Sequence, residues 1–429
     1  MRVPAALPDH LTHITPASYW QTFGPGLLWA AAAIGVSHLV QSTRAGADAG
    51  LALGGVILLA LMLKYPFFEY GPRYAAATGE SLVEGYRRIG TWAVWLYLAI
   101  TVSTALIIQT TVVLFTSFLI QASFGVPLPL PVVTALLIAT CVALLRVGRF
   151  HVLDLAIKAI LVLLASSTLF AAALTISRVD FQTLALWPPA SSGVSLPVIL
   201  ALAGWMPSAI DIAVWSSVWT LAKNRDSGRR ASVAHVLLDF RVGYIATGTL
   251  AFAFLVLGAG VMYGSGASFA GAGTQFSLEL VDLYTRTLGE WTRPIVLVAV
   301  LSTMFSTALT VIDGFPRAIA RTVRAMTAGD QTTEDAGDTG QVYQLASIVL
   351  GVLTVVVVAV FAGRLTTMVD FATIVSFLTG PILGYLNLRA VTADHVPREY
   401  RPGRGLILLS YAGLVLLGAT AVIYLVSLA

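Results

Sequence analysis

The chain has 429 residues, of which 57% are hydrophobic and only 11% are charged. Soluble domains carry about 25% charged residues, so this composition argues against a soluble protein and indicates a membrane protein with many spans. The net charge of +4 is small and no basic run is interleaved with aromatic residues, so nucleic acid is not an expected partner. The single Cys141 excludes a disulfide framework and a multi-cysteine metal site.

The hydropathy pattern predicts about eleven membrane-spanning helices, at about 20 apolar residues for each crossing. Residues 1–18 lack an apolar core, so we expect a cytoplasmic tail and no cleavable signal peptide. The helices are expected near residues 19–47, 51–76, 92–122, 129–146, 149–176, 195–222, 232–262, 291–324, 342–362, 366–390 and 405–428. Residues 258–273 are expected to form an extracellular loop and residues 327–341 a cytoplasmic linker.

Alternate connections between these helices are rich in basic residues, as cytoplasmic loops are. They contain Arg87, Arg88, Arg146, Arg149, Lys223, Arg225, Arg229, Arg230, Arg321, Arg324, Arg389, Arg398, Arg401 and Arg404. The other connections carry only scattered cations. The pattern therefore predicts a protein integral to the plasma (inner) membrane, with its N-terminus in the cytoplasm and its C-terminus outside.

Two of the expected helices are interrupted near the middle, the first at residues 35–38 and the sixth at residues 204–208. In lipid, a helix is broken only where its freed backbone groups line a cavity or bind something. Paired breaks in two halves of a chain point to an inverted-repeat transporter and its substrate site. The arrangement resembles the leucine-transporter-like fold: an all-α protein with a first repeat over residues 19–176, a second over 195–390 and an extra helix at 405–428.

The residues around the two breaks are expected to contact a substrate. They are Gly35, Ser37, His38, Ala203, Trp205, Met206, Ser208 and Asp211. An ionisable residue inside the membrane indicates function by default, so His38 is predicted to ligate a cation or carry a proton; a neutral imidazole bonded to a helix carbonyl is the alternative. Asp211 is the nearest plausible carboxylate, and its expected partner is Arg44. Asp211 either binds substrate or forms a salt bridge that gates the site, and the sequence leaves both roles open.

Other charges in the expected helices have local partners. Glu69 with Arg73, Asp154 with Lys158, and Asp313 with Arg317 are spaced i,i+4. Together with Arg44, Asp239 and Arg241, these six residues are predicted to form ion-pair or gating networks. Lys64 has no obvious local partner, and we expect its side chain to reach a membrane interface.

Several motifs resemble the natural resistance-associated macrophage protein (Nramp) family. Residues 24–27 (GPGL), 34–38 (IGVSH), 45–47 (AGA) and 77–82 (ATGESL) are similar to its first two helices. Residues 205–208 (WMPS) lie where the family breaks its sixth helix, and residues 302–314 are loosely similar to its eighth. The resemblance implies a proton-linked divalent metal transporter with a metal site between the two breaks.

The sequence departs from the family at the positions that bind metal. The family's first break reads Asp-Pro-Gly-Asn, and here Gly35 and His38 stand in the places of the Asp and Asn ligands. The family's second break reads Met-Pro-His; Met206 and Pro207 are retained, whereas Ser208 replaces the His. The third and ninth expected helices contain no charged residue, although the family's proton route runs there.

No nucleotide loop or zinc-protease motif is present, so we expect no enzyme and no cofactor. Three functions stay open. The first is a secondary transporter of a cation, by resemblance a divalent metal, with His38, Met206 and Asp211 as candidate ligands and protons as a candidate coupling ion. The second is a transporter of a non-metal organic solute on the same scaffold. The third is a membrane sensor that does not transport. Besides the small substrate, the lipid bilayer is the only expected partner.

Overall fold

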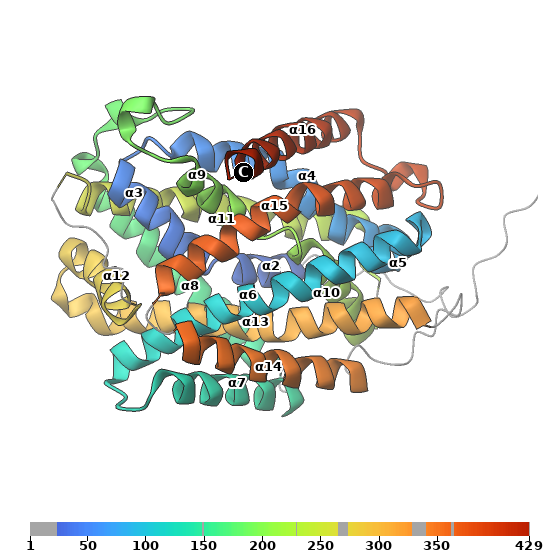
Figure 1. Cartoon of the computed structure of the whole chain (residues 1–429), viewed down its shortest axis with the longest axis horizontal. Helices are drawn as coiled ribbons and strands as arrows, with labels where there is room; N and C mark the ends of the chain where they lie inside the picture. The colour runs from blue at the N-terminus through green and yellow to red at the C-terminus, as the bar shows by residue number, and fades with distance from the viewer. Residues whose placement is uncertain are drawn as a thin grey trace, which may run out of the picture.

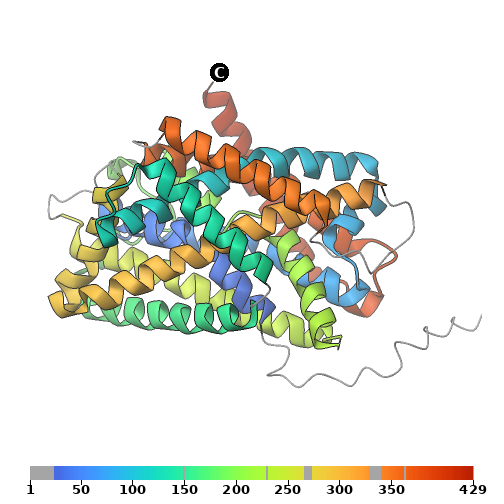
Figure 2. The same cartoon turned by 90° about the horizontal axis from the view of Figure 1, so that it is seen from below.

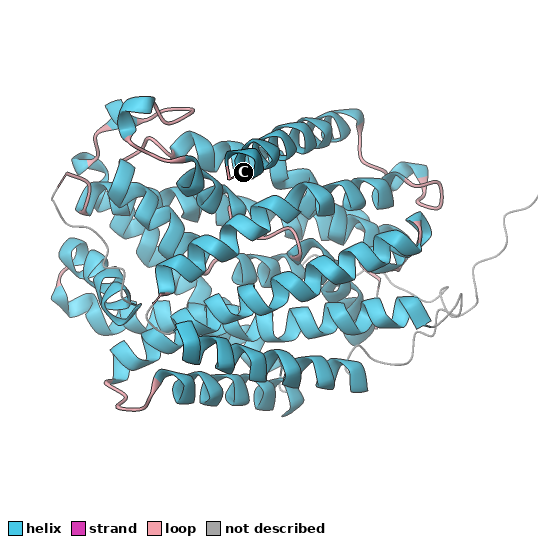
Figure 3. Cartoon of the chain, in the orientation of Figure 1, coloured by secondary structure: helices cyan, strands magenta, loops and turns pink. Residues whose placement is uncertain are grey.

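The computed structural model describes residues 24–147, 150–228, 230–264, 273–327, 340–361 and 364–428. These residues form helices and loops without any strand (Figure 3). The predicted all-α fold class is therefore confirmed. The expected tail over residues 1–18 lies outside the described residues, as do the centres of the two expected loops.

The first expected helix is broken where the sequence predicts. Helix α2 (Pro25–Ala33) ends at the break, the π-helical segment η2 (Ser37–Ser42) follows it, and α3 (Thr43–Ala49) completes the element. Proline is well suited to the first turn of α2, because the N–H that it lacks would have no partner within the helix. Between α2 and η2, the Gly35 carbonyl accepts from the backbone N–H groups of His38 and Leu39, and the Ile34 carbonyl faces the Thr307 hydroxyl at 3.3 Å.

The sixth expected helix is broken in the same way. Helices α9 (Leu196–Gly204) and α10 (Ile212–Ser227) are joined by the unwound residues 205–211. Proline cannot donate a backbone hydrogen bond and its ring clashes with the preceding helical turn. Pro207, whose peptide bond to Met206 is cis, therefore prevents α9 from continuing into α10.

The remaining helices follow the hydropathy pattern, with two additions. They are α4 (Gly54–Thr78), α5 (Leu82–Ile89), α6 (Thr91–Phe124), α7 (Leu130–Val147), α8 (Phe150–Thr175), α11 (Val233–Val261), α12 (Gly273–Leu288), α13 (Arg293–Thr327), α14 (Gln341–Phe361), α15 (Leu365–Thr392) and α16 (Arg404–Ser427), with short 3-10 turns η3 (Ile176–Arg178), η4 (Phe181–Thr183), η5 (Ala190–Ser192), η6 (Glu290–Thr292) and η7 (Arg398–Tyr400). Helices α5 and α12 were not expected, because both are too polar to stand out in a hydropathy profile.

Six helices in the described ranges are long and apolar enough to cross a membrane: α6, α11, α13 with η6, α14, α15 and α16. The expected count of about eleven spans is not confirmed by this measure. One reason is that each broken helix is divided into pieces that are individually too short, since α2 and α9 have 9 residues each.

Helix α2 lies inside the bundle and α16 at its periphery in both views (Figures 1 and 2). Trp29 of α2 is fully buried, and its ring lies 5.3–5.4 Å from the rings of Phe68, Phe240 and Tyr244 on α4 and α11. The backbones of α2 and α11 come into direct contact at Gly26, where an added Cβ would stand 2.2 Å from the carbonyl oxygen of Asp239. The first break is thus held rigidly at the centre of the protein.

Candidate functional site

A small cavity lies between the two helix breaks. Its walls come from both breaks and from the helices beside them: Ala32, Ala33, Gly35, Val36, Ser37, Ile108, Val112, Trp205, Ser208, Ala209, Asp211, Ile212, Trp215, Thr307, Val311 and Phe315. The space open to the centre of a water molecule is about 40 Å³, and one water needs about 10–15 Å³ by this measure. The cavity therefore has room for a hydrated ion or a small organic group.

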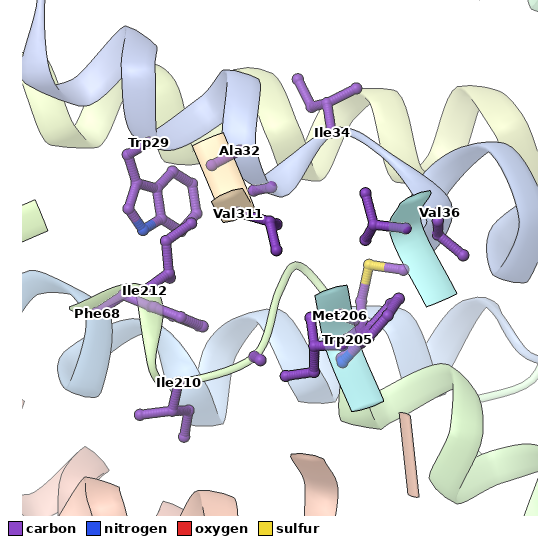
Figure 4. Packing of buried hydrophobic residues seen from close by; sticks show 14 of the residues in the cluster. Trp29, Ala32, Ile34, Val36, Phe68, Trp205, Met206, Ile210, Ile212 and Val311 are labelled. Carbon is purple, nitrogen blue, oxygen red and sulfur yellow. The ribbon is translucent and has the colours of Figure 1, made fainter. Parts of the chain in front are cut away.

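Figure 4 shows how the two breaks face one another. Trp205 and Met206 extend from the unwound segment after α9 toward the chain of the first break, where Ile34 and Val36 lie. Most of the wall is aliphatic or aromatic. The few polar groups on it should therefore decide what the cavity binds.

Among the described residues, Asp211 is the only acidic one on the cavity wall. Its side chain is 1% exposed and stands at the start of α10. The Thr104 hydroxyl on α6 donates a long hydrogen bond of 3.4 Å to Asp211 Oδ1, whereas Oδ2 has no hydrogen-bond partner among the described residues. Burying a carboxylate oxygen without a hydrogen-bond partner raises the free energy of the folded protein. A ligand that enters the cavity and binds Oδ2 would offset this cost.

The expected pairing of Asp211 with Arg44 is wrong. Arg44 instead donates to Asp370 on α15, with Nη1 and Oδ1 3.0 Å apart. Gln41 donates to the same Asp370 oxygen at 3.2 Å. These contacts join η2 and α3 to α15. Arg44 and Asp370 are both partly exposed, so their ion pair lies near the surface of the protein. Asp211 is buried in the interior, away from this pair.

His38 is fully buried but is not on the cavity wall. Its Nε2 lies 3.0 Å from the carbonyl oxygen of Thr247 on α11, and its Nδ1 lies 2.6 Å from the Ser37 hydroxyl. Because a carbonyl can only accept, Nε2 carries the proton. The single Ser37 hydroxyl proton has two acceptors within reach, His38 Nδ1 and the Ala33 carbonyl oxygen at 2.8 Å. The Nε2 contact ties η2 to α11, whereas the Nδ1 contact stays within η2. This is the alternative that the sequence left open for His38.

Gly35 allows the first break to approach α13. A Cβ at Gly35 would stand 2.8 Å from both the Oγ1 and the Cγ2 atoms of Thr307. The Thr307 hydroxyl donates to the Thr303 carbonyl of its own helix at 3.0 Å and also lies 3.3 Å from the carbonyl oxygens of Ala31 and Ile34, at the end of α2. Thr307 therefore stabilises the broken end of α2 from the neighbouring helix.

The second break is held by Lys64, and the expectation that this residue reaches a membrane interface is wrong. Lys64 on α4 is 3% exposed. Its ammonium group donates to the carbonyl oxygens of Ala203 at 3.1 Å, Gly204 at 2.9 Å and Ser208 at 2.8 Å. The predicted contact residue Ala203 thus presents its carbonyl to Lys64 rather than to the cavity.

The other predicted residues of the second break divide between the cavity and the core. Trp205 lines the cavity and its indole N–H donates to the Ser376 hydroxyl at 2.8 Å. Ser208 also lines the cavity. Met206 is fully buried and belongs to the hydrophobic core rather than to the cavity wall.

The three candidate metal ligands are therefore not gathered at one point of the cavity. Of His38, Met206 and Asp211, only Asp211 lies on the wall. Within the described ranges, no group of three or more His, Cys, Asp or Glu side chains could hold a metal ion. A metal ion in this cavity would have Asp211 as its one charged ligand and would need water for most of the others.

Glu69 is the centre of an ion network between α4 and α11. Arg73 Nε donates to Glu69 Oε1 at 3.0 Å, as the i,i+4 spacing predicts. Arg241 lies 3.6 Å from the other carboxylate oxygen, and Tyr65 donates a short hydrogen bond to it. Arg73 also donates to the Tyr400 carbonyl at 2.9 Å, which fixes the turn before α16.

The other predicted charges have separate structural contacts. Arg317 donates to Asp313 at 2.6 Å and 3.0 Å, and Tyr343 of α14 donates to the same carboxylate at 2.9 Å. Asp239 accepts from the backbone N–H groups of Gly24 at 3.2 Å and Gly26 at 2.7 Å, so it caps the N-terminus of α2. The side chains of Asp154 and Lys158 lie outside the described residues.

Sequence reasoning missed the residues that act on the breaks from other helices. Lys64, Thr104 and Thr307 are each more than 100 residues away in sequence from the break residues that they contact. One indication of these contacts is present in the sequence. Lys64 has no local partner, and a charged group inside the membrane needs acceptors elsewhere in the fold.

Comparisons with known proteins agree with this architecture. The profile of the family described as natural resistance-associated macrophage protein-like matches residues 26–427. An uncharacterised protein of Pasteurella multocida, PM0681, is 32% identical over 424 residues, which cover 97% of this chain and 95% of that protein.

Two solved structures share the fold at low identity. A mutant of the Eremococcus coleocola manganese transporter has a TM-score of 0.71 at 15% identity, covering 96% of this chain and 89% of the other. MhsT in complex with L-phenylalanine has a TM-score of 0.66 at 13% identity, covering 97% of this chain and 99% of the other. The predicted leucine-transporter-like fold is thereby confirmed.

Proposed function

Because the chain belongs to the natural resistance-associated macrophage protein-like family, we propose that it is a secondary transporter that carries a small cation by alternating access through the cavity between the two breaks. The observation that carries this proposal is the Asp211 carboxylate, which is buried at the cavity wall with Oδ2 unpartnered among the described residues. A cation is the ligand that would compensate this charge.

The donors at the cavity favour a hard divalent ion that keeps part of its water. Asp211, Ser208 and Ser37 offer oxygen atoms, and oxygen ligands suit Mg²⁺, Ca²⁺ and Mn²⁺. A fold relative is named a manganese transporter, which supports an ion of this class. The soft sulfur of Met206 is buried away from the cavity wall and adds no support for a softer metal.

A second candidate substrate is an organic solute with an ammonium group. Trp205, Trp215 and Phe315 all contribute to the cavity wall, and aromatic faces attract organic cations. Asp211 would pair with the ammonium group, while the aliphatic wall would accommodate the rest of the solute. The fold relative MhsT is described as a complex with L-phenylalanine, which supports this class of substrate.

Calorimetric titration of the purified protein with Mn²⁺, Mg²⁺, Ca²⁺ and Zn²⁺ tests the proposal. Hydrogen bonds to charged groups contribute about 1.5–3 kcal/mol, so Asp211→Asn should weaken binding of an ammonium group by about 10- to 100-fold. A divalent ion would lose its one charged ligand among the described residues of the cavity wall and should be weakened at least as much. The matched control is Glu399→Gln, which removes an exposed carboxylate that is not on the cavity wall.

The outcomes separate the two substrate classes. Saturable binding of a divalent ion that Asp211→Asn weakens by about 10-fold or more would support the metal substrate. Saturation only with small ammonium compounds, weakened in Asp211→Asn to the same extent, would support the organic cation. Binding of either class that is unaffected by Asp211→Asn would overturn the proposed role of this carboxylate.

We also propose the topology that the arginine pattern predicts, with a cytoplasmic N-terminus, an outer C-terminus and inverted repeats over residues 19–176 and 195–390. The paired breaks of α2–η2 and α9–α10 support this arrangement. Single cysteines introduced in a Cys141→Ser background at each end of the chain, probed with a membrane-impermeant thiol reagent in intact cells, test it. Labelling of the N-terminal site from outside would contradict the topology.

A further inference from the structure

The second break contains a set of carbonyl oxygens that converge on one point. The oxygens of Ala203, Gly204 and Ser208 all lie within 2.8–3.1 Å of the Lys64 Nζ atom. Ala203 and Gly204 end α9, and the last carbonyls of a helix lack helical partners and carry partial negative charge. Ser208 comes directly after Met206 and Pro207. Two of the three oxygens therefore precede the unwound Met206–Pro207 segment in the chain and one follows it.

The Lys64 ammonium group provides a hydrogen-bond donor for each of these three carbonyl oxygens. An ammonium group has three N–H donors, and each has one carbonyl acceptor here. The side chain is 3% exposed, and no ion pair to it is found in the part of the chain that the structure describes. Its charge is compensated by the backbone carbonyls and by the Phe68 ring, whose centroid lies 5.7 Å from Nζ.

We propose that the Lys64 ammonium is a tethered cation occupying a monovalent-cation site of the second break, and that it positions the cavity wall by holding α9 and Ser208 together. Ser208 is the link to the substrate cavity, because it lines that cavity while its carbonyl is bound to Lys64. The inference rests on the geometry of the break and not on the identity of the transported substrate.

The size of the carbonyl set indicates which free cation could replace the tether. The oxygens stand 2.8–3.1 Å from the central atom, which is longer than the about 2.0–2.6 Å at which Mg²⁺ and Ca²⁺ bind oxygen. The site therefore fits ammonium, a small alkylammonium ion or K⁺ better than a divalent ion. Lys64→Ala should leave both the carbonyl oxygens and the space of the lysine stem for such an ion.

Thermal unfolding of purified Lys64→Ala tests the proposal without any substrate. The midpoint is measured in N-methylglucamine chloride and in ammonium, methylammonium, ethylammonium and potassium chloride at equal ionic strength. We expect the variant to unfold several degrees below the unmodified protein in N-methylglucamine chloride, and to recover saturably with at least one small cation. The unmodified protein, in which Lys64 fills the site, gives the response of the rest of the protein to each salt, and recovery of the variant is measured relative to it.

Lys64→Met is the matched control, because it keeps an unbranched stem in the space but has no charge. It should be destabilised in every salt and should not be rescued. If Lys64→Ala cannot be purified in N-methylglucamine chloride, its yield in ethylammonium chloride becomes the readout, and recovery there supports the proposal.

Lack of recovery of Lys64→Ala in all four small-cation salts would overturn the tethered-cation assignment, as would equal rescue of Lys64→Met. Full stability of Lys64→Ala without any small cation would overturn it as well. Each recovery is counted relative to the unmodified protein, whose cavity also contains Asp211, so a small cation that binds there does not count as rescue and the proposed transport function keeps its own test.

Discussion

Thr307 lies so close to Gly35 that an added Cβ on the glycine would stand 2.8 Å from two of the threonine's side-chain atoms. The hydroxyl of Thr307 uses this proximity to bind the broken end of α2. Gly35 is therefore required by the packing of the first break against α13, and this contact fixes one wall of the candidate cavity.

Gly35→Ala should destabilise the protein by about 1–3 kcal/mol, the usual cost of forcing extra atoms into a packed core. Thermal unfolding of the purified protein measures this. Gly405→Ala on α16 is the matched control, because an added Cβ there meets nothing within 4 Å. Adding Thr307→Ala to Gly35→Ala should recover part of the loss, since it removes both crowded atoms; strictly additive effects would show that the two residues are not coupled.

Thr307→Val isolates the hydrogen bond from the packing. Valine keeps the shape of threonine but cannot donate to the Thr303 carbonyl of its own helix or to the carbonyls of Ala31 and Ile34 across the helix contact, so these acceptors lose a partner. The expected loss is about 1–3 kcal/mol in the free energy of unfolding. Thr249→Val on α11 is the control, because its exposed hydroxyl bonds only within its own helix. Equal effects of the two substitutions would contradict a special role for Thr307.

The sequence predicts the two breaks well, because their cause is local. Gly35 and Pro207 interrupt apolar stretches, and the breaks appear as the gaps between α2 and η2 and between α9 and α10. The apolar composition likewise predicts an all-helical fold. Helix α12 has 16 residues but was not predicted, because its polar residues keep the hydropathy of this segment below that of a membrane-spanning helix.

The partners of the breaks could not be predicted, because they depend on tertiary packing. Arg44 pairs with Asp370, 326 positions away, although Asp211 was the acid that the sequence made prominent. Lys64 donates to carbonyls about 140 positions away. Backbone carbonyls carry no sequence signal, so a lysine that binds them looks unpaired until the fold is known.

His38 offers a test that separates structural from substrate contacts. Because its two ring nitrogens bind Ser37 and the Thr247 carbonyl, His38→Ala should reduce stability by about 2–5 kcal/mol, as for other large core truncations. Substrate binding by the folded fraction should change far less than in Asp211→Asn. If His38→Ala retained full stability but lost binding, the imidazole would have to be assigned to the substrate site.

His395 predicts a pH dependence of stability at the loop between α15 and α16. Partial burial, and then the positive charge of Arg88, lower the pKa of His395 below the usual 6.5. The Tyr74 hydroxyl lies 2.7 Å from Nε2 and can donate to it only while that nitrogen is unprotonated. The unfolded chain therefore binds the proton more readily than the folded protein, so stability from this group is complete above about pH 6.5 and is lost as the pH falls below it.

His395→Gln should flatten this part of the pH profile, because glutamine does not titrate. Unfolding midpoints of the two proteins measured between pH 5 and pH 8 make the comparison, with His235→Gln as a control at a half-buried histidine near the start of α11. The unmodified protein and His235→Gln should lose stability in parallel toward pH 5, while His395→Gln loses less. Parallel profiles for all three proteins would mean that other groups cause the acid sensitivity, and that the Tyr74 contact survives protonation of the imidazole.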